Sequence, residues 1–75
     1  MHRYKVNLDT QTDLIRFVDK ATKLPTSVFL TDSTNTFIVN GKSVLGALYA
    51  KAEWGELWVS SENDIYSDIL DFIAE

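Results

Sequence analysis

The chain has 75 residues, of which 45% are apolar and 24% charged, which suits one small globular domain spanning residues 1–75. It has no cysteine, so disulfides and thiolate metal sites are excluded. The net charge is −4 and the seven basic residues are scattered, which argues against nucleic acid as a partner. No apolar run predicts a membrane span or a signal peptide, so we expect a cytoplasmic protein.

The first third of the chain predicts a strand followed by a helix. Residues 3–8 alternate between polar and apolar side chains, as a half-buried strand does. Thr10 and Asp13 have the spacing of a capping box. A helix is predicted from there to about Leu24, because Pro25 disfavours helical geometry in the residue before it.

The middle of the chain predicts a hairpin and a short helix. Segments 27–31 and 36–40 are rich in β-branched and aromatic residues, and the polar residues 32–35 between them favour a turn. Gly41 and Lys42 form a further turn. A helix is then predicted over residues 43–52, with Ser43 as its N-cap.

The last third predicts a strand over residues 56–60 and a final helix. Ser61 and Asp64 have capping-box spacing, and apolar residues follow at helical intervals, namely Ile65, Ile69, Phe72 and Ile73.

The predicted order β-α-β-β-α-β-α indicates an open-faced α+β sandwich, with a four-stranded antiparallel sheet and three helices on one face. The opposite face of the sheet would carry Phe29, Ile38 and Trp58. Those side chains are too apolar for a plain solvated face. Either they form an adhesive surface, through which two copies of the chain would associate, or the predicted register is wrong by one residue.

This element order and several segments resemble the bacterial phosphocarrier protein HPr of the sugar phosphotransferase system. Residues 42–47, Lys-Ser-Val-Leu-Gly-Ala, resemble the family's Lys-Ser-Ile-Met-Gly-Val stretch, which contains a regulatory serine. Residues 17–23 resemble the end of the family's first helix, and Gly55 with Leu57 and Val59 resembles its fourth strand. The resemblance covers nearly the whole chain and implies the same open-faced sandwich.

The chain departs from the family at the loop before the first helix. The family has a Gly-Leu-His-Ala-Arg-Pro motif there, whose His accepts a phosphoryl group, whereas residues 8–13 read Leu-Asp-Thr-Gln-Thr-Asp. Alignment through Phe17 puts Thr10 at the His position and Thr12 at the Arg position. The only histidine is His2. A phosphohistidine carrier needs an imidazole nucleophile, so we expect no histidine phosphotransfer and no enzyme activity.

The resemblance therefore implies the regulatory type of family member, which lacks the histidine and is phosphorylated on the serine in carbon catabolite control. Ser43 would be the phosphorylated residue, and the partner-binding residues would be Lys42, Val44, Leu45 and Leu48. The implied partners are proteins, an HPr kinase and a transcriptional regulator. We expect no cofactor and no metal, because neither a Gly-rich phosphate loop nor a convergent set of metal ligands occurs.

The residues alone leave a second interpretation open. A serine at a helix start is by itself an N-cap worth about 1 kcal/mol. Under this interpretation the chain is a constitutive protein–protein interaction module without phosphorylation. An exposed Ser43 hydroxyl surrounded by exposed apolar side chains favours the regulatory interpretation, and a buried helix start favours the constitutive one.

Overall fold

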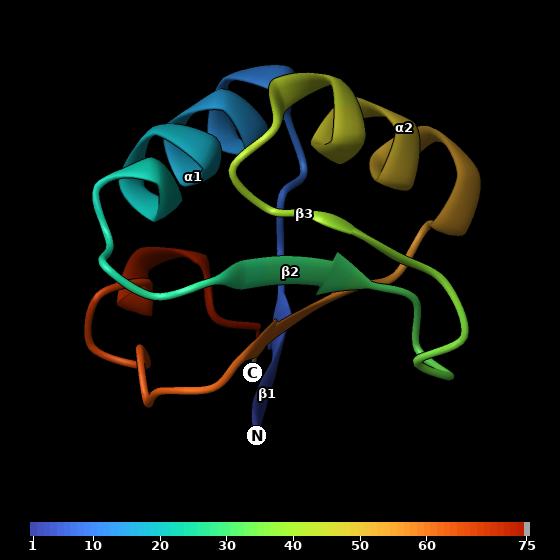
Figure 1. Cartoon of the computed structure of the whole chain (residues 1–75). Helices are drawn as coiled ribbons and strands as arrows, with labels where there is room; N and C mark the ends of the chain where they lie inside the picture. The colour runs from blue at the N-terminus through green and yellow to red at the C-terminus, as the bar shows by residue number, and fades with distance from the viewer. Residues whose placement is uncertain (75) are drawn as a thin grey trace.

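The computed structural model describes residues 1–74, and Glu75 lies outside the described residues. Within this part the elements are β1 (His2–Val6), α1 (Gln11–Thr22), β2 (Val28–Thr31), β3 (Ile38–Asn40), α2 (Val44–Trp54) and β4 (Leu57–Ser61), followed by a 3-10 turn at Leu70–Phe72. The strands form one antiparallel sheet in the order β1-β4-β2-β3. The two α-helices lie on the same side of it (Figure 1). The predicted α+β class and four-stranded antiparallel sheet are confirmed.

The prediction of a third helix is wrong. Ile65 and Ile69 are buried as expected, but the backbone around them makes turns, and only Leu70–Phe72 is helical, as a 3-10 segment. Serine, asparagine and aspartate are frequent between Ser61 and Asp71, and these side chains compete with helical backbone hydrogen bonds. Ser61 does not cap a helix, because it is the fully buried last residue of β4.

The end of the described chain instead covers the outer edge of β1. Asn7 N–H donates to the Phe72 carbonyl at 2.8 Å, and Ala74 N–H donates to the Lys5 carbonyl at 2.8 Å. These bonds place the last residues antiparallel to β1, with Ile73 opposite Val6. Strand pairing satisfies backbone groups that a helix here would leave exposed on the β1 edge.

The Tyr4 side chain of β1 binds the turn at Asp64 and Ile65 and so holds it against the sheet. Its hydroxyl donates to Asp64 Oδ1 at 2.6 Å and accepts from Ile65 N–H at 3.2 Å. Asp64 Oδ1 also accepts from Tyr66 N–H at 3.0 Å. Desolvation and the bond to Asp64 both raise the pKa of Tyr4.

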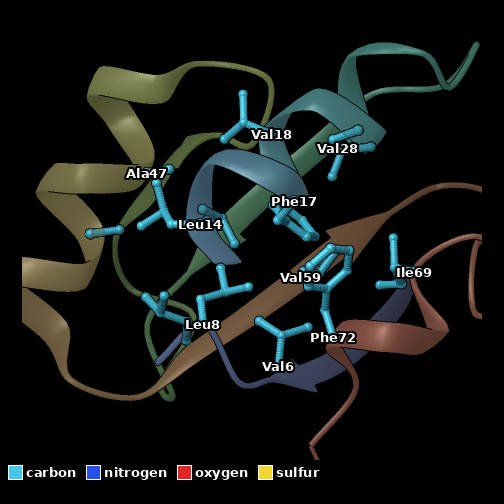
Figure 2. Packing of buried hydrophobic residues seen from close by; sticks show 14 of the residues in the cluster. Val6, Leu8, Leu14, Phe17, Val18, Val28, Ala47, Val59, Ile69 and Phe72 are labelled. Carbon is cyan, nitrogen blue, oxygen red and sulfur yellow. The ribbon is translucent and has the colours of Figure 1, made fainter. Parts of the chain in front are cut away.

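The hydrophobic core lies between the sheet and the helices, and the C-terminal segment completes it. Figure 2 shows Phe17 of α1, Val59 of β4 and Phe72 pointing toward one another. The rings of Phe17 and Phe72 meet edge to face, with their centroids 5.5 Å apart. Leu14, Phe17, Leu30 and Ile69 have no solvent exposure. Residues 1–74 contain no helix with the length and apolar character that a membrane crossing requires.

The opposite face of the sheet has the predicted register. Lys5, Trp58, Thr31 and Ile38 are successive partners across the four strands and share that face. Arg3 covers much of its apolar surface, because its guanidinium lies 4.8 Å from the centroid of the Trp58 ring and donates to Thr31 Oγ1 at 3.1 Å. Trp58 is half-buried under this guanidinium and Phe29 is also half-buried, while Ile38 on the edge strand stays exposed.

Asp32 organises the connection between β2 and β3. Its Oδ1 accepts from Thr36 N–H at 2.7 Å and from Phe37 N–H at 3.0 Å, and its Oδ2 accepts from the Thr34 hydroxyl at 2.7 Å. The bond from Thr34, followed by the backbone bonds, lowers the pKa of Asp32. This loop also holds Asn35 at a φ of 60°, a left-handed conformation that asparagine tolerates.

We expect the stability of the fold to fall in acid partly through Asp32. The folded-state pKa of Asp32 lies below the unfolded value of about 3.9, so folding favours the ionised carboxylate. Its contribution is complete above pH ~4 and is lost as the pH falls through the lower, folded pKa. The measurement is thermal unfolding of wild type and of Asp32→Asn between about pH 3 and about pH 7. The melting temperature of wild type should drop more on acidification than that of the variant.

The matched control for this measurement is Asp9→Asn, which removes the same charge from an exposed position before α1. Asp9→Asn should keep the acid slope of wild type. If both variants lose the same part of the slope, total charge rather than the Asp32 hydrogen bonds causes the acid dependence.

Candidate functional site

The turn before α2 fixes where that helix begins. Gly41 N–H donates to the Val28 carbonyl at 2.8 Å, which extends the β2–β3 ladder by one bond. A Cβ at Gly41 would lie 2.9 Å from that carbonyl oxygen, so the close approach requires glycine. Asn40 then closes the turn, because its Oδ1 accepts from Lys42 N–H at 2.9 Å and its carbonyl accepts from Ser43 N–H at 3.1 Å.

Ser43 is the N-cap of α2, as predicted. It has extended backbone geometry, with φ −108° and ψ 121°, and its Oγ accepts from Gly46 N–H at 3.1 Å. The residue is half-buried. Within residues 1–74 the hydroxyl donates no hydrogen bond, so its proton points to no fixed acceptor.

The electrostatics at this helix end favour negative charge. The first turn of α2 contains no acidic residue, and unpaired N–H groups carry partial positive charge there. Lys42 is next to Ser43 in sequence, but its ammonium donates to the Leu24 carbonyl beyond the end of α1, at 2.8 Å. The Lys42 side chain is therefore next to the helix start, but its ammonium is bound to the Leu24 carbonyl.

The apolar residues predicted as a docking surface are partly exposed. Leu45 is 80% exposed and Val44 is 41% exposed, whereas Leu48 is half-buried and packs on the core. The buried side of α2 consists of Ala47 and Ala50. We call Val44, Leu45 and Leu48, together with Ser43, the α2 start surface. Ser43 and Leu48 are half-buried while Val44 and Leu45 are exposed, so this helix start is neither the fully exposed surface nor the buried start that the two interpretations require.

Comparison with protein-family models, curated proteins and solved structures finds no match for this chain. The site is therefore characterised by its own geometry.

A row of aromatic side chains beside the α2 start surface was not predicted as part of the site. Phe37 stacks on Trp54 with ring centroids 6.5 Å apart, and Tyr49 meets Trp54 edge to face at 6.3 Å. Phe37 and Tyr49 are exposed. The sequence signal was the spacing of Leu45 and Tyr49, which lie four residues apart and so share one helix face.

Thr10 and Thr12, the two residues that the resemblance aligned with a His and an Arg, lie at the exposed start of α1. Thr10 is the N-cap of that helix, and its Oγ1 accepts from Asp13 N–H at 3.0 Å. No hydrogen bond joins either threonine to Ser43 within the described residues. The described part of the chain also contains no group of three acidic or histidine side chains placed to hold a metal ion.

An open hollow of about 280 Å³ lies behind the loop that follows β1. Its charged lining consists of Lys5, Asp9, Lys51 and Glu56, and neither Thr10 nor Thr12 contributes to it. The Lys5 ammonium pairs with Glu56 at 2.8 Å, and this pairing lowers the pKa of the Glu56 carboxyl. Since the opposite charges offset one another, the hollow has no cluster of cations for a phosphoryl group.

Proposed function

We propose that this chain is an HPr-like regulatory protein that has lost histidine phosphotransfer and binds a protein partner through the α2 start surface, under the control of phosphorylation at Ser43. The observation that carries the proposal is the exposure of Leu45 and Val44, at 80% and 41%, directly after an N-cap serine. Exposed apolar side chains grouped in this way are typical of protein-binding surfaces.

The helix start suits a phosphoserine. A phosphate on Ser43 would carry roughly −1.5 to −2 charges at neutral pH. It would stand at the positive end of the α2 dipole, with no acidic side chain in the first turn to repel it. Its oxygens would replace the Ser43 hydroxyl as acceptors for the N–H of Gly46.

The modification also defines what a partner must provide. In the kinase reaction Ser43 Oγ attacks the γ-phosphorus of ATP, the bond from that phosphorus to the oxygen of ADP breaks, and the hydroxyl proton passes to a base of the kinase. The product presents a dianion next to Val44 and Leu45. A partner that recognises it needs an arginine or lysine beside an apolar pocket.

A second candidate function is a constitutive interaction module without phosphorylation. It is favoured by the Lys42 ammonium, which donates to the Leu24 carbonyl at 2.8 Å and is therefore already occupied. It is also favoured by the half-buried position of Ser43, whose Oγ serves as a cap.

The deciding experiment is the intact mass after incubation with ATP and an HPr kinase. Wild type should gain one phosphate, and Ser43→Ala should gain none. Thr10→Ala is the matched control, because it also removes an N-cap hydroxyl, at a cost of about 1 kcal/mol, but at α1. This variant should gain one phosphate, and circular dichroism should show that all three proteins are folded.

A parallel incubation with phosphoenolpyruvate and the first enzyme of the phosphotransferase system should add no phosphate. Phosphate gained there would contradict the loss of phosphotransfer. No phosphate from either donor would contradict regulation through Ser43 and leave the constitutive module as the function.

A further inference from the structure

The edge of the sheet at β3 is open. β3 pairs with β2 on one side, and no other strand of residues 1–74 pairs with it on the other side. The opposite edge of the sheet differs, because Ile73 is paired with β1 there. An open edge is a template for strand pairing with another chain.

The ladder between β2 and β3 shows which backbone groups are free. Asp32 N–H donates to the Phe37 carbonyl and Gly41 N–H donates to the Val28 carbonyl. In an antiparallel ladder the bonded residues alternate, so Phe37, Val39 and Gly41 face β2. The N–H and the carbonyl of Ile38 therefore both point away from β2, toward the open edge.

This edge is short, since β3 has three residues, but it lacks the chemical protections against pairing. Residues 33–41 contain no charged side chain and no proline, and Phe37 and Ile38 are 60% and 58% exposed. Natural edge strands are commonly blunted by lysine, proline or bulges. The chain has a net charge of −4, but two copies that met at this neutral segment would bring no like charges together at the contact.

We propose that β3 pairs antiparallel with β3 of a second copy of this chain, about a two-fold axis at Ile38. An isologous contact of this kind places the same surface on both subunits. Each Ile38 N–H then donates to the Ile38 carbonyl of the second copy. The two Ile38 side chains meet on the outer face, and each Phe37 ring lies opposite Val39 of the second copy on the helix face. One antiparallel sheet runs through both chains.

The test is sedimentation equilibrium of the whole chain over a wide concentration range. The apparent mass of wild type should rise with concentration from that of one chain to that of two. Ile38→Pro removes only an N–H that faces away from β2, a place where edge strands tolerate proline. Ile38→Lys sets two like charges at the axis. Each variant should raise the dimer dissociation constant at least tenfold.

Leu70→Lys is the matched control, because it adds the same charge at an exposed apolar residue of the segment that covers β1, at the opposite edge of the sheet. It should leave the dissociation constant unchanged, and circular dichroism should show that all variants are folded. A wild type that stays at the mass of one chain at every concentration overturns the proposal. So does a dimer that both Ile38 variants leave intact, or one that Leu70→Lys weakens equally.

Discussion

Replacing Phe17 with alanine is expected to destabilise the folded chain by about 3–5 kcal/mol. Phe17 is the largest side chain with no solvent exposure, and its ring meets Phe72 at 5.5 Å. A chain of 75 residues has a total unfolding free energy of about 4–11 kcal/mol, so this loss removes much of the stability. Urea unfolding followed by circular dichroism measures the effect.

The control for Phe17 is Ile15→Ala on the same helix. Ile15 is exposed, so its truncation leaves no cavity, and the expected change in unfolding free energy is within about 0.5 kcal/mol. Equal losses for the two variants would mean that α1 packs through a different face than the one described.

Replacing Phe72 with alanine is expected to cost about 3 kcal/mol, at the low end of the range for a buried phenylalanine. Phe72 is buried, and it belongs to the segment that pairs with β1. We expect that segment to detach locally before the whole chain unfolds. Hydrogen exchange should therefore accelerate at the N–H groups of Asn7 and Ala74, which bond across this pairing, more than at Leu30 within the sheet.

Leu70→Ala is the control in the same 3-10 turn, because Leu70 is exposed. It should leave both the unfolding free energy and the two exchange rates close to wild type. Unchanged exchange at Asn7 and Ala74 in Phe72→Ala would show that Phe72 does not anchor the segment.

Local patterns predicted most of the sheet and the first helix. The alternation around Tyr4 and Val6, the capping spacing of Thr10 and the turn composition after Thr31 are all short-range signals, and the structure agrees with each. The third helix was mispredicted because Ile65, Ile69 and Phe72 have the spacing of a helix although the chain here follows turns. Whether this segment forms a helix or follows turns depends on its pairing with the edge of β1. That edge is distant in sequence, so local periodicity carries no information about it.

The candidate site was predictable in part for the same reason. The capping role of Ser43 follows from its own neighbours, and the structure confirms it. Which side of α2 is buried was harder to predict from sequence, because this helix has apolar residues on all of its sides. Small residues at Ala47 and Ala50 let the helix approach the sheet closely, which leaves the larger Leu45 outward. The hydrogen bond from Lys42 to Leu24 joins distant segments and had no sequence signal.

The pairing of the last described residues with β1 has a consequence for biosynthesis. β1 is translated before either of its neighbours, since β4 begins at Leu57 and Ile73 comes later still. Both sides of the strand stay unpaired while the intervening residues leave the ribosome. Contacts this far apart in sequence are slow to form, and unpaired strands attract other chains. The sheet is thus expected to close around β1 only after residue 73 has been synthesised.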